Sequence, residues 1–267
     1  MFRSLVIPLF AAAAFGSPPA AFADDDNDSR SLRAEPFVFV GARGDCGELA
    51  VGIPYPAGSN IVTSAWLRGM GLPDNGGPNS SAADLESNPN KRDPHRGLLL
   101  SKNGPTADCS ATGARMGGVR GMVVTPEFAL GYDYRNGGHC GAGAPRFNVS
   151  YTVPGGGDGS SFVGGCANDS TPTPAPQDPL QWSRVRFETS NPAESFPVIP
   201  LGSRIQSITL IFDEGTDVPT GPRPSGDLGN PAGIGLSVVD NIFIDGQFIR
   251  RGAGIEPRPG NKGHDDD

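Results

Sequence analysis

The chain has 267 residues, a formal net charge of −8, 39 glycines, 27 prolines and 36% hydrophobic residues. This length suits one large all-β domain or two small ones, and no linker-like change of composition divides the middle, so we expect one domain. Seven of the 29 acidic residues lie in the two terminal segments and no basic stripe is present, which excludes the electrostatic footprint of a nucleic-acid-binding protein.

The first 23 residues have the features of a secretory signal peptide. Arg3 supplies a positive start, an apolar run follows, and Ala21–Ala23 is a small-x-small cleavage site. The run is shorter than the roughly 20 residues of a transmembrane helix, so no membrane span is predicted. We therefore expect a secreted or periplasmic protein with a disordered acidic segment over 24–34 and a disordered tail over 251–267.

Ten segments between residues 35 and 250 predict strands, because they alternate apolar and polar residues and are bounded by Gly, Pro and Asn. They are Pro36–Ala42, Asn60–Leu67, Gly97–Lys102, Val119–Thr125, Phe128–Arg135, Arg146–Thr152, Ser160–Gly164, Trp182–Thr189, Ile205–Asp213 and Ile234–Ile249. No stretch shows convincing helical periodicity. The expected fold class is all-β: a single antiparallel β-sandwich, jelly-roll-like, with long Gly/Pro-rich loops at 72–96, 167–180 and 218–232.

The four cysteines predict two disulfides. Disulfides persist in exported proteins, and four cysteines allow three connectivities. If the strand beginning at Arg146 forms a hairpin with the strand that follows it, Cys166 returns close to Cys140. This geometry favours Cys140–Cys166 and, by elimination, Cys46–Cys109.

Near the end of the chain, Gly235–Ile249 (GLSVVDNIFIDGQFI) resembles the closing strand of jelly-roll carbohydrate-binding modules and galactose-binding-like domains. Ile208–Asp217 is similar to the penultimate strand of those modules. The resemblance implies a β-sandwich with a carbohydrate ligand, and a structural calcium held by Asp240 with Glu35 as its partner in the first strand. A group of uncharacterised secreted bacterial proteins, from which no activity follows, resembles two further segments, 97–114 and 131–149.

Oxygen-rich residues after a predicted strand also suit calcium. Asp213 and Asp217 bracket a short acidic turn, and carboxylate oxygens are ligands that calcium prefers. The candidate calcium ligands are therefore Asp213, Asp217 and Asp240, against the alternative of a solvated turn. No other cofactor is expected.

Alternation on two predicted strands places arginines beside an aromatic side chain. Trp182, Arg184 and Arg186 share one face of their strand, and Arg146 and Asn148 share one face of another. Sugar sites combine aromatic faces with planar polar side chains, whereas the alternative is that Trp182 belongs to the core and the arginine stems cover the outer sheet. The predicted ligand-binding residues are Trp182, Arg184, Arg186, Arg146, Asn148, Arg135 and His139.

The expected function is a non-catalytic, monomeric, exported module that binds extracellular or envelope polysaccharide. No catalytic residue is predicted. His139 and Cys140 are neighbours whose side chains point apart on an extended chain, so they do not indicate a Cys–His nucleophile. The alternatives are a structural or adhesive surface protein without a small ligand, and a glycan-active hydrolase or lyase.

Overall fold

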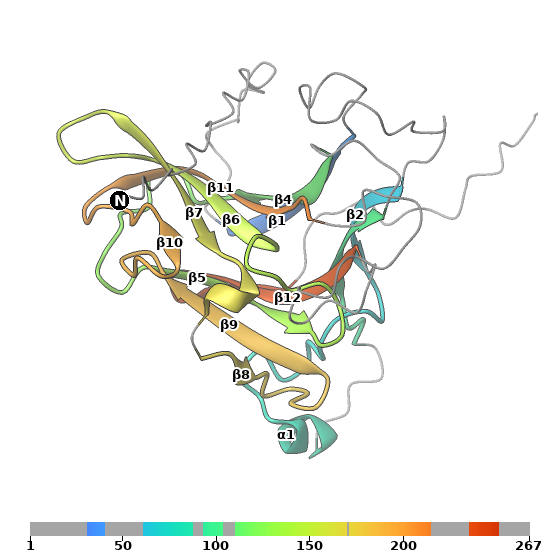
Figure 1. The fold of residues 1–267 in the computed structure, drawn as a ribbon. Helices are drawn as coiled ribbons and strands as arrows, with labels where there is room; N and C mark the ends of the chain where they lie inside the picture. The colour runs from blue at the N-terminus through green and yellow to red at the C-terminus, as the bar shows by residue number, and fades with distance from the viewer. Residues whose placement is uncertain are drawn as a thin grey trace, which may run out of the picture.

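The computed structural model describes residues 31–40, 61–87, 93–103, 110–169, 171–214 and 235–250. Within these ranges the chain forms two antiparallel sheets packed face to face (Figure 1). The predicted class, an all-β antiparallel sandwich, is confirmed. None of the helices in the described ranges is long and apolar enough to cross a membrane.

The two sheets have six and seven strands. In spatial order the first consists of β1 (Arg33–Phe39), β4 (Ala111–Gly117), β11 (Arg204–Phe212), β6 (Arg146–Thr152), β7 (Asp158–Gly164) and β10 (Ser195–Phe196). The second consists of β2 (Ile61–Leu67), β3 (Gly97–Asn103), β12 (Leu236–Ile244), β5 (Ala129–Arg135), β9 (Trp182–Glu188) and β8 (Thr173–Pro174), and β13 (Gln247–Ile249) pairs with β12. The described helices are α1 (Ala82–Ser87) and the 3₁₀ turn η2 (Cys166–Asn168).

The core lies between the sheets and follows the predicted alternation. Phe147, Val149 and Tyr151 of β6 face inward, as do Val185 and Phe187 of β9. At the edge where β1 and β2 meet, the Trp66 indole N–H donates to the Ala34 carbonyl at 3.1 Å. β1 begins at Arg33, two residues before the expected start of the domain.

Two strand predictions are wrong. Val119–Thr125 forms only an isolated bridge between Val123 and Arg204, because glycines at φ +80° and +85° turn the chain there. The strand at this place in the chain is β4, whose small residues give a weak sequence signal. Ile234–Ile249 is not continuous, since a turn at Asp245 and Gly246, both at positive φ, separates β12 from β13.

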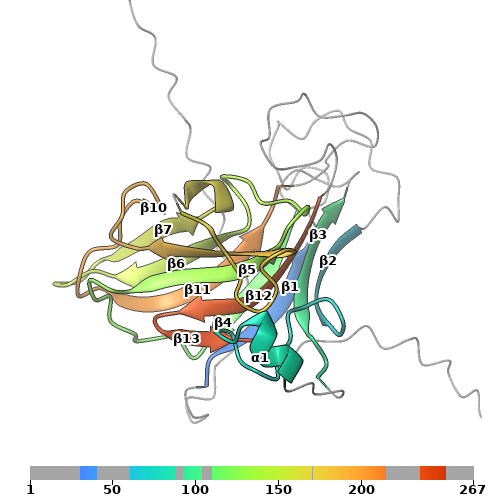
Figure 2. The ribbon, with the colours of Figure 1, turned by 90° about the horizontal axis from the view of Figure 1, so that it is seen from below.

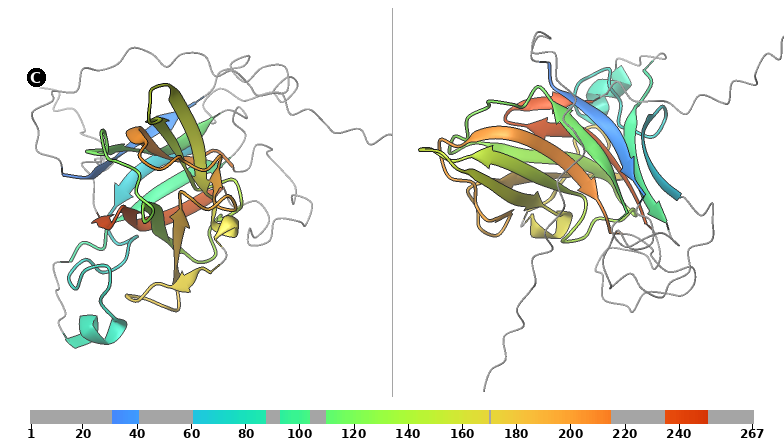
Figure 3. Two further views of the ribbon diagram at one scale, coloured as in Figure 1. Left: turned by 90° about the vertical axis from the view of Figure 1, so that its left-hand side faces the viewer. Right: turned by 90° about the horizontal axis from the view of Figure 1, so that it is seen from above.

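The outer faces of the two sheets differ in what covers them. The segment 68–81, which leads into α1, lies against the seven-stranded sheet (Figure 2), where a second apolar cluster forms from Leu72, Ala175, Trp182 and Val238. Viewed from the other side, the six-stranded sheet lies in front with α1 behind it (Figure 3, right). No described segment lies over the outer face of the six-stranded sheet in these views (Figure 1 and Figure 3).

Candidate functional site

The seven predicted ligand-binding residues separate into three places. Trp182, Arg184 and Arg186 lie on the covered face of the seven-stranded sheet, and exposed Arg135 lies at the end of β5, the strand beside β9. The other three lie elsewhere: Arg146 and Asn148 are on the outer face of the six-stranded sheet, whereas His139 is buried at one end of the sandwich.

Trp182 is not an exposed platform. Its side chain is 3% exposed and packs in the second apolar cluster, beneath Leu72. The sequence alternation placed it correctly beside the arginines, but the segment 68–81 folds over that face. The alternative interpretation, an aromatic residue used for packing, is what the structure shows.

Arg184 holds a buried carboxylate and the covering segment at the same time. Its Nε and Nη2 lie 2.8 and 2.9 Å from the two carboxylate oxygens of Asp133, which has no exposed surface. The same guanidinium donates to the Pro78 carbonyl at 2.6 Å and to Asn79 Oδ1 at 3.1 Å. All of these contacts are internal, so they indicate a structural role.

Arg186 lies flat on the sheet beside Arg184. Its guanidinium is 4.7 Å from the ring centre of Phe243 and 5.4 Å from that of Phe248. Gly131 makes room for it, since a Cβ there would come within 2.8 Å of Arg186 Cδ. Burial lowers the pKa of Arg186 to about 10, while the nearby Asp133 carboxylate opposes that shift, so the side chain stays charged at neutral pH.

The predicted calcium ligand Asp240 is part of a β-bulge in β12. The register with β5 shifts between Asp240 and Phe243, and Asn241 adopts a positive φ of 45°, which asparagine tolerates. Asp240 accepts the backbone N–H of Asn241 at 2.6 Å and that of Leu72 at 2.8 Å. Burial raises its pKa well above the usual value, and the two N–H donors only partly offset this.

Asn241 connects the bulge to its surroundings. Its Nδ2 is 2.7 Å from Asp133 Oδ2 and 2.7 Å from Gln177 Oε1, and Gln177 in turn donates to the Pro73 carbonyl. The Asp-Asn pair of the closing strand therefore anchors the segment 68–81.

The structure does not gather the proposed calcium ligands. Asp240 lies on the seven-stranded sheet, whereas Glu35 is exposed on the opposite sheet and pairs with Arg33 at 2.6 Å. Asp213, at the end of β11, accepts both Nη atoms of Arg146 at 2.6 Å, and Asp217 lies outside the described residues. In the described part of the chain, no group of three or more His, Cys, Asp or Glu side chains has a geometry suited to a metal ion.

His139 belongs to a polar cluster at the end of the sandwich. It is fully buried, with Nε2 2.9 Å from Glu214 Oε2 and its ring edge-on to Phe212. Buried Lys102 donates to the Asp213 carbonyl at 2.7 Å. These contacts fix the end of β11 against the β5–β6 connection.

The predicted Cys140–Cys166 disulfide is confirmed and lies beside this cluster, with Cα atoms 5.2 Å apart. It ties the β5–β6 connection to η2, which follows β7. The hairpin between β6 and β7, on which that prediction depended, is also present. The predicted Cys46–Cys109 pair lies outside the described residues.

A row of side chains, which no other described segment covers, crosses the outer face of the six-stranded sheet, and we call it the cross-strand row. Each member is directly opposite the next on the neighbouring strand, and the residues before and after it on its own strand mostly face the core. In order the row is Glu35, Arg115, Thr209, Asn148, Phe162 and Phe196.

Two aromatic rings form one end of this row. Phe162 and Phe196 are 49% and 45% exposed and are paired directly across β7 and β10. The Arg146 guanidinium stands 5.3 Å from the Phe162 ring centre, and Arg115 stands 4.6 Å from that of Phe37. Single exposed apolar residues are normal on a protein surface, whereas adjacent ones form an apolar patch that a partner can contact.

The sequence reasoning found only part of the cross-strand row. It placed Arg146 and Asn148 on one face of β6 but did not single out Phe162 in β7. Alternation in β7 places Phe162 and Val163 on different faces of the sheet. Phe196 carried no signal, because β10 is only two residues long. The row itself depends on the register of five strand pairs.

The comparisons with known proteins assign no family to this chain. No family model, no curated protein and no solved structure matches this chain.

Proposed function

We propose that this protein is an exported, non-catalytic module that binds extracellular or envelope polysaccharide on the outer face of its six-stranded sheet. The observation that carries the proposal is the pair of exposed rings, Phe162 and Phe196, at one end of a row of polar side chains. Export is supported by the signal-peptide features of residues 1–23.

The chemistry of the row suits a sugar chain. A phenylalanine ring offers an apolar face to the C–H side of a pyranose, Arg115 offers N–H donors, and the Thr209 hydroxyl offers a donor and an acceptor for sugar hydroxyl groups. Adjacent strands lie about 4.8 Å apart, so the six positions form an extended track that fits several consecutive sugar units better than a single one.

The covered arginines and the paired carboxylates favour binding over catalysis. A glycosidase needs two acids across an open cleft. The carboxylates nearest the predicted binding residues are both engaged: Asp133 is enclosed by Arg184 and Asn241, and Asp213 is held by Arg146. The cross-strand row contains a single carboxylate, that of Glu35.

A polysaccharide panel followed by affinity electrophoresis tests the proposal. We expect Phe162→Ala/Phe196→Ala to weaken binding of the best polysaccharide by about tenfold or more, corresponding to roughly 1.4 kcal/mol. The matched control is Leu180→Ala/Leu201→Ala, which removes two side chains of similar or greater exposure outside the row.

The length of the ligand provides a second measurement. Arg115→Ala should weaken binding of long oligosaccharides and leave disaccharide binding unchanged, because Arg115 lies three strands away from Phe162 in the row. The proposal would be overturned if Phe162→Ala/Phe196→Ala and Leu180→Ala/Leu201→Ala lost polysaccharide affinity equally, or if no polysaccharide bound. Either result would favour a structural surface protein.

A further inference from the structure

One aromatic ring of the cross-strand row is in contact with an ion pair. The Arg146 guanidinium lies over the Phe162 ring, with Cζ 5.3 Å from the ring centre, and this is within the roughly 6 Å of a cation–π contact. The same guanidinium makes two parallel hydrogen bonds to Asp213, from Nη1 to Oδ1 and from Nη2 to Oδ2, each 2.6 Å long. We call Asp213, Arg146 and Phe162 the ring-holding triad.

Strand register brings the guanidinium to the ring. Arg146 of β6 is directly opposite Gly164 of β7, and the next pair on the same face of β6 is Asn148 and Phe162. Diagonal neighbours of this kind lie about 7–8 Å apart, which is within reach of long and aromatic side chains. Gly164 places no side chain opposite Arg146, so the guanidinium can extend across β7 toward Phe162.

The ion pair is fixed from two separate elements. Asp213 follows the end of β11, and its main-chain carbonyl accepts a hydrogen bond from Lys102 Nζ at 2.7 Å. Arg146 Nη1 also donates to the Gly143 carbonyl at 2.6 Å. Gly143 belongs to the β5–β6 connection, which the Cys140–Cys166 disulfide ties to η2. Both charged groups are therefore held in place before any ligand arrives.

The triad lies at the surface. The side chains of Arg146 and Asp213 are 19% and 31% exposed, and Phe162 is one of the two exposed rings of the row. Ion pairs with exposed surface contribute little to the stability of a fold. The position of this pair against an exposed ring therefore indicates a role in shaping the binding surface.

We propose that Asp213 is a positioning residue of the polysaccharide site, because it holds Arg146 against Phe162 and so fixes the ring in the orientation that contacts the sugar. This inference rests on the proposed function and deepens it, since Asp213 lies outside the cross-strand row and needs no contact with the polysaccharide. A side chain that is ordered before binding loses less conformational freedom when the ligand arrives, and this increases affinity.

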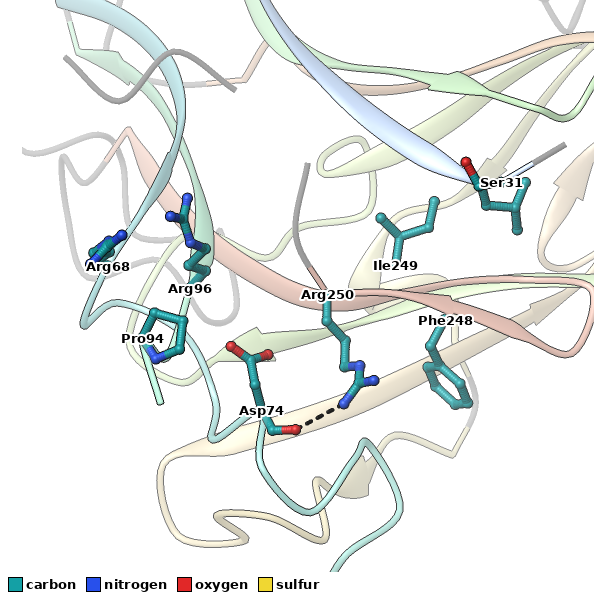
Figure 4. Close-up of a pocket in the computed structure, with 9 residues that line it drawn as sticks. Ser31, Arg68, Asp74, Pro94, Arg96, Phe248, Ile249 and Arg250 are labelled. Carbon is teal, nitrogen blue, oxygen red and sulfur yellow. Dashed lines mark hydrogen bonds between the residues drawn. The ribbon is translucent and has the colours of Figure 1, made fainter. Parts of the chain in front are cut away.

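The pocket at the edge of the seven-stranded sheet is separate from the triad (Figure 4). It has a volume of about 730 Å³, and Arg250 in its wall donates from Nη1 to the main-chain carbonyl of Asp74 at 2.9 Å. Its described lining contains none of the triad residues. Substitutions in the triad therefore leave the wall of this pocket unchanged.

Ring motion in the free, full-length protein tests the positioning role. With ¹³C-labelled phenylalanine, the order parameter of the Phe162 ring should fall in Asp213→Asn, because an asparagine side chain has a single acceptor oxygen and cannot accept both Nη atoms. Asp158→Asn is the matched control and should keep the wild-type value. Asp158 is an exposed carboxylate of the same sheet that accepts hydrogen bonds from Thr152 and Gln206. An unchanged order parameter in a folded Asp213→Asn would contradict the proposal.

Isothermal titration shows whether the position of the ring matters for binding. The probe is whichever of laminarin, xylan, galactomannan and alginate binds the wild type most tightly, at 0.5 M salt, where the change in net charge is screened. Asp213→Asn should reduce affinity by about two- to tenfold, whereas Asp158→Asn should not change it. In a Phe162→Ala background Asp213→Asn should cause no further loss, because its effect passes through the ring. If Asp213→Asn unfolds, Arg146→Lys should give the same result, since lysine keeps the charge but not the two parallel hydrogen bonds.

The outcomes separate this inference from the function on which it rests. Binding that depends on Phe162 but not on Asp213 would overturn the positioning role and leave the proposed function standing. An equal loss from Asp213→Asn with and without the Phe162 ring would also overturn it. Binding to none of the four polysaccharides would overturn both proposals.

Discussion

Replacing Arg184 by alanine should destabilise the protein far more than removing an exposed arginine. In the native state Arg184 donates two hydrogen bonds to Asp133, whose side chain is completely buried. It donates two more to Pro78 and Asn79 of the covering segment. The substitution would leave a buried carboxylate with reduced compensation and release part of that segment.

The structure sets the size of this effect. Removing one partner of a buried ion pair typically costs 3–5 kcal/mol. Two groups reduce the loss here: Asn241 Nδ2 stays 2.7 Å from Asp133, and Arg186 Nη2 lies 3.6 Å away. We therefore expect a decrease in the free energy of unfolding of about 3 kcal/mol, at the lower end of that range. For a protein of this size that corresponds to a fall in Tm of roughly 6–12 °C.

Urea unfolding followed by tryptophan fluorescence measures the effect. The matched control is Arg204→Ala, an exposed arginine without a side-chain ion pair among the described residues, which should change stability by less than about 0.5 kcal/mol. Adding Asp133→Asn to Arg184→Ala should recover part of the loss, because the unpaired charge is gone. If Arg184→Ala is as stable as Arg204→Ala, Arg184 does not have the structural role inferred for it.

One further outcome follows from the same contacts. Trp182→Ala should cost about 3 kcal/mol in urea unfolding, because it leaves a cavity beneath Leu72. The variant should still bind polysaccharide well below its Tm, and loss of binding in the folded variant would return Trp182 to the ligand site.

Local sequence signals were enough for most of the sandwich. Alternation correctly placed Arg146 with Asn148, and Arg184 with Arg186, on shared strand faces, since in a strand the side-chain direction follows directly from position. The same reasoning predicted the β6–β7 hairpin and, through it, the Cys140–Cys166 disulfide. These features connect residues that are near one another along the chain.

Features that depend on distant segments were not predictable in this way. In β4, Gly113 must lie close to Leu210, since a Cβ there would come within 2.0 Å of the carbonyl oxygen. Trp182 is buried because a segment a hundred residues earlier covers its face, held by Asp240, Gln177 and Arg184. No pattern within β9 contains that information.

The candidate binding residues were likewise predictable where local sequence determined their position, and not where distant segments did. The arginines of β9 share a face with Trp182, as alternation required, but the role of that face depended on what covered it. The cross-strand row arises from register between strands, and register between non-adjacent segments is fixed by the packing of the whole sandwich.

The disulfide also determines how the molecule would respond to a cut in its backbone. Cys140 and Cys166 lie on either side of the β6–β7 hairpin, so the chain between them is a closed covalent ring. One cleavage at the glycine turn 155–157 would open the ring without separating the protein into two molecules, and the fragments would run apart in electrophoresis only after reduction. Asn148 and Phe162, which are neighbours in the cross-strand row, would remain parts of one covalent unit although the peptide chain between them was broken.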